Sequence, residues 1–220
     1  MKQFCIRFLK MLFGLFLFGL GIVLIIRTNL GYTPWDVFHA GLANITILTL
    51  GTASIIVGLV ILIALVITGE KLGLGAILNM LLVGIFIDVL MIPGLIPEMN
   101  TLLSGSIMLI VGLFAISFGS YFYIGSGFGA GPRDALMVVL TRVTKIPVGI
   151  CRSALEIIVT IAGWFLGGLV GIGTIVSAIG IGFCIEITFK VLKFDVTSVK
   201  HESLRDTFNS VKASLQHKTT

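Results

Sequence analysis

Residues 50–68 read LGTASIIVGLVILIALVIT, a stretch without a charged side chain. A helix that crosses the hydrocarbon core of a bilayer needs about 20 mainly apolar residues, and this stretch has that length. Similar apolar runs lie at 8–26, 74–92, 103–124, 148–166 and 172–191. In lipid only helices and closed barrels satisfy the backbone polar groups, and continuous rather than alternating runs indicate helices. The sequence therefore predicts an all-α, polytopic transmembrane helical bundle with about six spans.

The composition excludes a soluble fold. Charged residues make up 11% of the 220-residue chain and hydrophobic residues 57%, whereas soluble domains contain about 25% charged residues. The net charge is +5, and most of the basic residues stand before residue 11 or after residue 189. Because they flank membrane spans, we expect the lipid bilayer as a partner and no nucleic acid. The three scattered cysteines form neither a disulfide framework nor a metal motif, so no metal or cofactor is expected.

The chain contains an internal repeat, because it matches itself without a gap when it is shifted by 98 residues. The shift superimposes Pro34 and Asp36 on Pro132 and Asp134. It also pairs glycines 21, 31, 51, 69, 73, 75 and 84 with glycines 119, 129, 149, 167, 171, 173 and 182. A constant period indicates one structural unit used twice. We predict a membrane domain over 1–192, with repeat 1 at about 8–95 and repeat 2 at about 103–192, and a polar tail over 193–220 that forms an amphipathic helix or is a solvated segment.

Two shorter, more polar segments, 34–48 and 132–146, decide the number of spans. If they cross the membrane, eight spans form two parallel repeats; if they do not, each repeat has three spans and the second repeat is inverted. Lys and Arg favour the cytoplasmic side, and the six-span arrangement leaves only Arg27 outside. Six spans, two short re-entrant or interfacial helices, inverted repeats and cytoplasmic termini are therefore favoured. The basic residues of the connections that this arrangement places inside are Lys71, Arg133, Arg142 and Lys145.

The paired turns NLGYTPWD, 29–36, and GFGAGPRD, 127–134, supply the first candidate site. Glycine permits a sharp bend, proline suits the first helical position, and an acid favours the first turn of a helix. A helix broken in this way inside a membrane protein presents free N–H groups to an anionic or polar solute. The candidate binding residues are Trp35, Asp36, Gly131, Pro132, Arg133 and Asp134. The alternative is ordinary helix capping.

Arg152 and Glu156 supply the second candidate, because they lie four positions apart on one helix face inside an apolar run. Ionisable residues within spans usually face a cavity or a partner. We predict one network of Arg133, Asp134, Arg152 and Glu156 that binds substrate; the alternative is a structural ion pair. The corresponding positions of the first repeat hold Ser54 and Gly58 rather than charges.

Asp88 and Glu186 occupy matching places near the ends of the third and sixth apolar runs. They are candidates for coupling to protons or cations, or else charges at the membrane interface. No Ser/His pairing, His/Asp cluster or metal-ligand spacing that would serve a reaction is present in the sequence, so we predict no catalytic residues and no enzyme.

The motifs GPRDALM, 131–137, and PWDVFHAGL, 34–42, resemble those of the YczE/YyaS/YitT family of bacterial integral membrane proteins, and most of all its YczE-like branch. Arg152, Glu156 and the glycine-rich stretch at 167–174 fit the same pattern. The resemblance implies a multi-pass protein of the bacterial plasma membrane. It does not supply a reaction.

These patterns favour a small-solute transporter or permease with a charged site between the repeats. Arg133 and Arg152 would attract an anionic group of the solute, and Glu156 would orient them or couple ions. The alternative is a non-catalytic membrane partner, such as the substrate-binding subunit of a larger transporter or a regulatory scaffold, with a homo-oligomer as a further arrangement.

Overall fold

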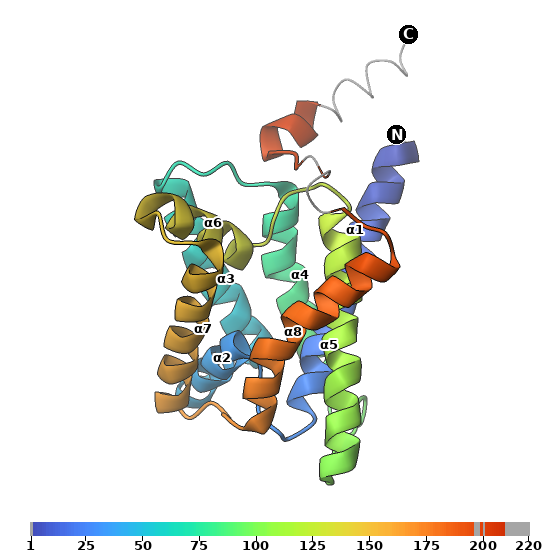
Figure 1. Ribbon diagram of the computed structural model, residues 1–220, viewed down its shortest axis with the longest axis vertical. Helices are drawn as coiled ribbons and strands as arrows, with labels where there is room; N and C mark the ends of the chain where they lie inside the picture. The colour runs from blue at the N-terminus through green and yellow to red at the C-terminus, as the bar shows by residue number, and fades with distance from the viewer. Residues whose placement is uncertain (1, 196–198, 200, 210–220) are drawn as a thin grey trace.

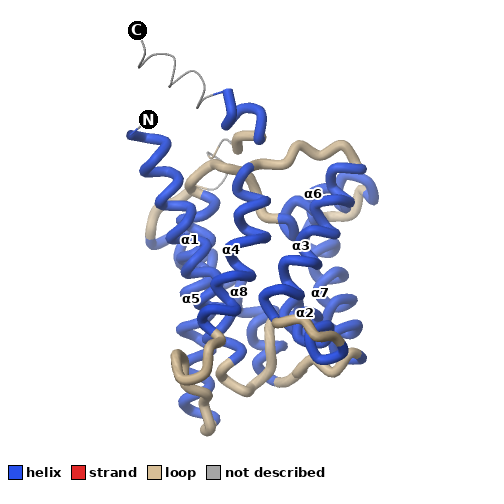
Figure 2. The backbone as a smooth tube through the Cα atoms, turned by 180° about the vertical axis from the view of Figure 1, so that it is seen from behind, coloured by secondary structure: helices blue, strands red, loops and turns tan. Residues whose placement is uncertain are grey.

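The computed structural model describes residues 2–195, 199 and 201–209. That part of the chain is helical and contains no strand, as Figures 1 and 2 show, so the prediction of an all-α fold is confirmed. A short helical stretch at 204–209 follows the eight main helices. The main helices are α1 (Lys2–Ile26), α2 (Pro34–Ile45), α3 (Leu50–Ile67), α4 (Leu74–Leu90), α5 (Leu102–Ile124), α6 (Pro132–Thr144), α7 (Val148–Phe165) and α8 (Ile172–Val191).

Helix lengths separate the spanning from the non-spanning segments. Within the described residues, α1, α3, α5, α7 and α8 are long and apolar enough to cross a membrane, and the apolar α4 is slightly shorter, at 17 residues. Helices α2 and α6 have 12 and 13 residues. At 1.5 Å per residue they are about 18–20 Å long, too short for a hydrocarbon core of about 30 Å. Figure 1 places α2 near one end of the bundle and α6 near the other.

Helices separated by the 98-residue shift run in opposite directions. In Figure 1, α1 leads away from the end at which it begins and α5 leads back toward it; α3 and α7, and α4 and α8, are opposed in the same way. The packing also corresponds. Helix α1 packs on α4 as α5 packs on α8, and α2 packs on α7 as α6 packs on α3. One interface breaks the pattern, because α3 and α4 pack closely whereas α7 and α8 do not.

The same backbone conformations recur in the two halves of the chain, α1–α4 and α5–α8. Left-handed φ angles occur at three pairs of positions that the shift superimposes: Asn29 and Gly127 (φ 57° and 76°), Gly31 and Gly129 (φ 116° and 107°), and Gly69 and Gly167 (φ 80° and 88°). Few residues other than glycine and asparagine adopt this conformation. The glycine series in the sequence therefore fixes the same turns twice.

Each half also hydrogen-bonds to the turn of the other. The amide of Gly75, in the first turn of α4, donates to the carbonyl of Phe128 over 2.7 Å. The corresponding amide of Gly173, in the first turn of α8, donates to the carbonyl of Leu30, also over 2.7 Å. These bonds satisfy carbonyl groups of the turns between helices, which have no helical partner of their own.

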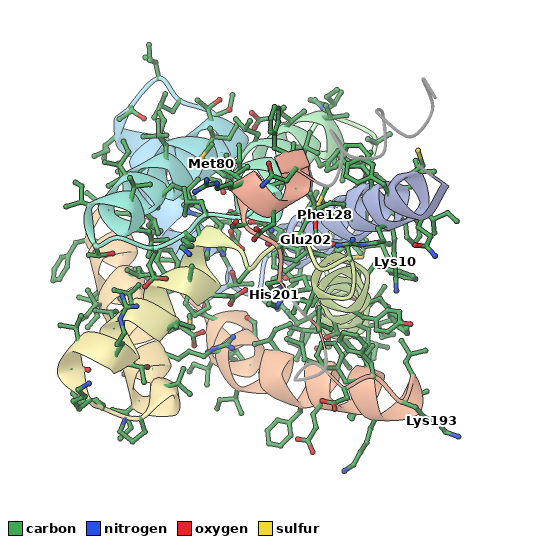
Figure 3. The ribbon with its side chains drawn as sticks, turned by 90° about the horizontal axis from the view of Figure 1, so that it is seen from above. Lys10, Met80, Phe128, Lys193, His201 and Glu202 are labelled. Carbon is green, nitrogen blue, oxygen red and sulfur yellow. The ribbon has the colours of Figure 1, made fainter. Side chains whose placement is uncertain are left out.

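The end of the bundle where α1 begins is covered by residues 201–209. The Arg7 guanidinium donates to Glu202 Oε1 over 2.7 Å and to the carbonyl of Ser126 over 2.8 Å, and it lies over the Phe128 ring. Figure 3 shows Glu202 beside Phe128 in a view onto this end. The predicted tail helix lies partly outside the described residues; in the helical stretch at 204–209, Leu204 and Phe208 are exposed.

Substitution of Gly21 tests the central contact between α1 and α5. A Cβ atom there would lie 2.6 Å from the carbonyl oxygen of Gly112. Because backbone cannot yield easily, Gly21→Ala should destabilise the protein by about 1–3 kcal/mol and lower the midpoint of thermal unfolding in detergent. The control is Gly182→Ala on α8, where a Cβ meets nothing within 4 Å and melting should be unchanged or slightly higher. Equal effects of the two substitutions would contradict this packing.

Candidate functional site

A cavity of about 140 Å³ lies between the two halves, where the first turns of α2 and α6 face each other. Both helices begin with a proline, Pro34 and Pro132, whose missing N–H costs nothing at the first helical position. All the predicted binding residues line this cavity: Trp35, Asp36, Gly131, Pro132, Arg133, Asp134, Arg152 and Glu156. Ser54 and Gly58, which correspond to Arg152 and Glu156, line it as well.

One end of the cavity holds a chain of hydrogen bonds between buried groups. Asp36 and His39 are almost completely buried, and their Oδ1 and Nδ1 atoms are 3.3 Å apart. The Arg133 guanidinium lies 3.5 Å from His39 Nε2 and stacks over the Trp35 ring at 5.0 Å. A guanidinium only donates, so His39 accepts at Nε2 and donates from Nδ1–H to Asp36. The Thr33 hydroxyl donates to the other carboxylate oxygen, Asp36 Oδ2.

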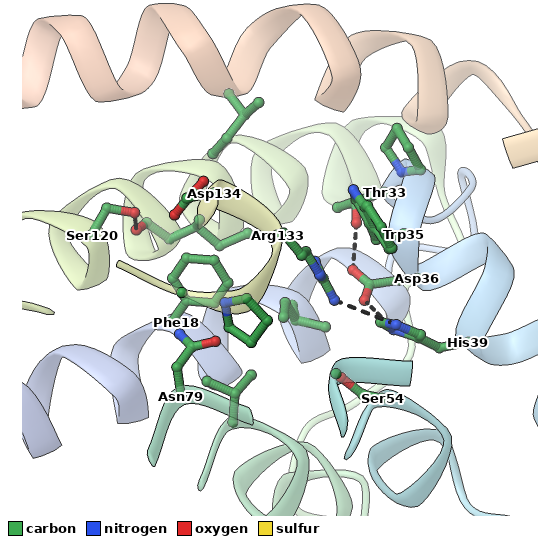
Figure 4. Close-up of a pocket in the computed structure, with 18 of the residues that line it drawn as sticks. Phe18, Thr33, Trp35, Asp36, His39, Ser54, Asn79, Ser120, Arg133 and Asp134 are labelled. Atoms are coloured by element: carbon green, nitrogen blue, oxygen red, sulfur yellow. Dashed lines mark hydrogen bonds and ion pairs between the residues drawn. The ribbon is translucent and has the colours of Figure 1, made fainter. Parts of the chain in front are cut away.

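The other end of the cavity is more open. Asp134 is exposed, and the side chain of Arg152 is 42% exposed while it donates to Glu156 Oε1 over 3.0 Å. Figure 4 shows Arg133 reaching toward Asp36 and His39, whereas Asp134 points away from them toward Ser120. The charges of the four residues in the predicted network act on one another across the cavity, but few of them are joined by a direct bond. Arg133 and Asp134 are adjacent on a helix and point in different directions, so within the described residues a hydrogen-bonded ion pair joins Arg152 and Glu156 alone.

The formal charge of the cavity does not favour an anion. Two cationic side chains, Arg133 and Arg152, face three carboxylates, Asp36, Asp134 and Glu156. With His39 neutral, as its hydrogen bonds require, two positive and three negative charges leave a formal charge of −1. The positive field expected from the two arginines is thus offset within the site itself.

Several cavity residues are not apparent from the charged motifs. Asn79 on α4 and Tyr123 on α5 line the cavity, and the Tyr123 hydroxyl is buried without a hydrogen-bond partner in the described residues. The indole N–H of Trp35 is likewise buried and unpartnered in that part of the chain. Asn79 carries a sequence signal, because it is a lone amide inside an apolar run. Tyr123 carries none, because aromatic residues are common near the ends of spans.

The acids predicted to couple ions lie away from the cavity. Asp88 accepts hydrogen bonds from the Thr49 hydroxyl over 2.6 Å and from the Gly51 amide over 2.8 Å, which ties the end of α4 to the start of α3. Glu186 is exposed and lies 3.6 Å from Lys190. Neither side chain lines the cavity. Their role in coupling remains a prediction, and the contacts of Asp88 give it a structural use.

The helices, their apolar lengths and the enclosed polar cavity define a multi-pass helical membrane protein. The chain belongs to the family of unknown function DUF6198, whose model matches residues 5–190. It is 36% identical over 177 residues to the uncharacterized membrane protein YczE of Bacillus subtilis, a match that covers 80% of this chain and 81% of YczE. The YczE-like resemblance of the motifs is thereby confirmed.

Two further relatives extend this comparison. An uncharacterized protein of Haemophilus influenzae is 32% identical over 182 residues, which is 83% of each chain. The uncharacterized protein YyaS of Bacillus subtilis is 26% identical over 182 residues, covering 82% of this chain and 90% of YyaS. No solved structure matches the chain.

The two corresponding carboxylates should contribute differently to stability. Asp36→Ala removes the acceptor of both Thr33 and His39 and leaves the Arg133 charge unbalanced at the buried end of the cavity. Breaking a buried charged network in this way costs about 3–5 kcal/mol, so thermal unfolding in detergent should begin at a much lower temperature. The matched variant is Asp134→Ala, at the same place in the second half, which should melt close to the wild type. Similar losses in both variants would show that the two ends are equally integrated.

Proposed function

We propose that this protein is a transporter or permease for a small polar organic solute, and that the cavity between its halves is the solute-binding site. The observation that carries the proposal is the position of the cavity, enclosed between the first turns of α2 and α6 and lined by charged side chains from both halves. Secondary transporters of several folds place their sites at discontinuous helices between repeats. A purely structural core would have no reason to retain three carboxylates and two guanidiniums in contact with an open space.

The opposed, matching halves support an alternating-access mechanism. We infer that they are inverted repeats, in keeping with their reversed helix directions, recurrent turns and paired hydrogen bonds. Such halves can exchange conformations, so that a helix interface that is closed in one state opens in the other. The close packing of α3 on α4 and the looser arrangement of α7 and α8 fit two halves in different conformations. The exposed Asp134 and Arg152 place the mouth of the cavity toward α6 and α7.

The distribution of basic residues favours a cytoplasmic position for the end where α1 begins. That end carries Arg7, Lys71 and Arg142, of which Arg7 and Arg142 pair with Glu202 and Glu70, whereas the opposite end carries Arg27, which pairs with Glu98. Arg133 lies in the cavity and is removed from the count of loop charges. In this orientation both short helices are re-entrant and the cavity of the present state opens to the cytoplasm.

A non-catalytic partner role is the second candidate, and the exposure of α7 and α8 favours it. Only 17% of the apolar window of α7 and 22% of that of α8 are buried within the described part of the chain, against 50% for α1. The remainder contacts lipid in a transporter that acts alone. In a substrate-binding subunit, a helix of a partner protein would cover the exposed surface between α7 and α8. Purification in a mild detergent distinguishes these cases, because a subunit should retain a second membrane protein. In neither role does the protein act as an enzyme.

Access to Ser54 tests the transport proposal without knowledge of the solute. Ser54 lines the cavity and is 9% exposed, and cysteine is nearly isosteric with it. In a variant whose native cysteines are replaced by alanine, Ser54→Cys should react with an impermeant thiol reagent from both membrane faces. Right-side-out and inside-out vesicles provide the two faces.

Two further single-cysteine variants calibrate the vesicles. Lys71→Cys should react from the cytoplasmic face alone and Glu98→Cys from the outer face alone. Modification of Ser54→Cys from one face only would argue against transport and for a binding subunit. Reversed labelling of the two markers would invert the proposed orientation.

A further inference from the structure

The carboxylates of Asp36 and Asp134 occupy the same position in the two halves but have different surroundings. Asp36 is satisfied by the chain itself, through the Thr33 hydroxyl and the His39 ring. The 98-residue shift replaces these two partners by Gly131 and Met137, neither of which has a side-chain N–H or O–H group. Asp134 accordingly has no hydrogen bond or ion pair within the described residues, although it faces the cavity.

Other acceptors gather around the position that a side chain at residue 131 would occupy. A Cβ atom on Gly131 would lie 3.4 Å from Asn79 Oδ1 and 3.5 Å from the Tyr123 hydroxyl. Tyr123 is 2% exposed, and its hydroxyl is without a partner in the described part of the chain. A buried hydroxyl left unpaired costs about 1–3 kcal/mol, so its persistence beside a cavity points to a ligand that completes it.

We propose that Asp134, Tyr123 and Asn79 bind the ammonium group of the solute. An ammonium has three N–H donors and no acceptor. The Asp134 carboxylate acts electrostatically on Tyr123, so this corner offers a carboxylate, a phenol oxygen and the amide oxygen of Asn79. The bound ammonium would replace, in the second half, the donors that Thr33 and His39 supply to Asp36 in the first. The inference rests on the proposed function, since it names the chemical class of the solute that the same cavity carries.

The rest of the cavity limits the size and the second group of the solute. The volume of about 140 Å³ is close to that of an engineered cavity of about 150 Å³ that holds benzene, so the solute is compact. At the opposite end of the cavity, Arg133 has guanidinium donors beyond the one directed at His39, and the Trp35 N–H is buried without a partner in the described residues. They suit an acceptor group such as a carboxylate. The site therefore fits a short zwitterion better than a simple anion, in agreement with its formal charge of −1.

Thermal unfolding of the purified protein in detergent tests the class of solute. Three matched series of straight-chain compounds serve as probes: alkylammonium chlorides, ω-amino acids and sodium alkanoates, with sodium and potassium chloride at equal ionic strength. We expect the ω-amino acids to raise the unfolding midpoint most and the alkylammoniums to raise it less. The alkanoates should raise it no more than sodium or potassium chloride does. Stabilisation by alkanoates alone, equal stabilisation by the salts, or no stabilisation by any ammonium compound would overturn the proposal.

Two variants locate the effect. Asp134→Asn should weaken ammonium binding by more than about tenfold, because a hydrogen bond to a charged group contributes about 1.5–3 kcal/mol. Gly131→Ala places a methyl group at ordinary contact distance between Asn79 and Tyr123, so it should block the corner while the protein still folds. The controls are Glu98→Gln, on the loop before α5, and Gly182→Ala, where a Cβ meets nothing within 4 Å. Both should bind as the wild type does; retained binding in Asp134→Asn would overturn the assignment.

Failure of this inference is separable from failure of the transport proposal. Labelling of Ser54→Cys from both faces, without ammonium binding, would leave a transporter of a different solute. Ammonium binding together with labelling from one face only would leave the binding site intact and remove transport.

Discussion

Lipid offers no hydrogen-bond partner to a broken helix, and this constraint organises the molecule. Where the chain turns sharply at Gly31 and Gly129, carbonyl groups lose their helical partners. The amides of Gly75 and Gly173 replace those partners, each from the opposite half of the chain. Each turn is thus held by the other half of the chain, and the first turns of α2 and α6 line the same cavity. The cavity is thus a consequence of how the backbone is satisfied.

Within this matched backbone, the two halves differ in side-chain chemistry. At the buried end, Thr33, Asp36 and His39 form a closed set of hydrogen bonds that also holds Arg133 across the interface. At the open end, the equivalent of Thr33 is a glycine, and Asp134 has no hydrogen bond or ion pair in the described residues, only the nearby charges of Arg152 and Arg133. One turn is therefore closed by the chain's own hydrogen bonds, whereas the other leaves its carboxylate open to the cavity. Two matching turns permit this division, because one can hold the fold while the other carries different side chains.

Much of the architecture could be predicted from the sequence, because bilayer thickness fixes span length and glycine fixes turns. The apolar runs, the two short helices and the residues of both Pro-x-Asp turns all correspond to observed elements and cavity residues. The partners of the charges could not be predicted. Arg133 pairs across the interface with His39, 94 positions away, and such a contact depends on the direction of a side chain rather than on spacing. The buried position of Tyr123 and the hydrogen bond of Asp88 at the start of α3 could not be predicted for the same reason.

The formal charge of the cavity shows why single charged residues are poor guides to a ligand. Arg133 and Arg152, considered alone, favour an anion, yet each lies near carboxylates that the fold brings to the same cavity. Arg152 is already engaged by Glu156, one turn away. Arg133 donates into a chain that ends at Asp36, and its face is covered by the Trp35 ring. What remains unsatisfied is a set of acceptors around Gly131 and one indole donor at the far end. A ligand is selected by the groups that the protein leaves unpaired, and these groups support the proposed solute with an ammonium group.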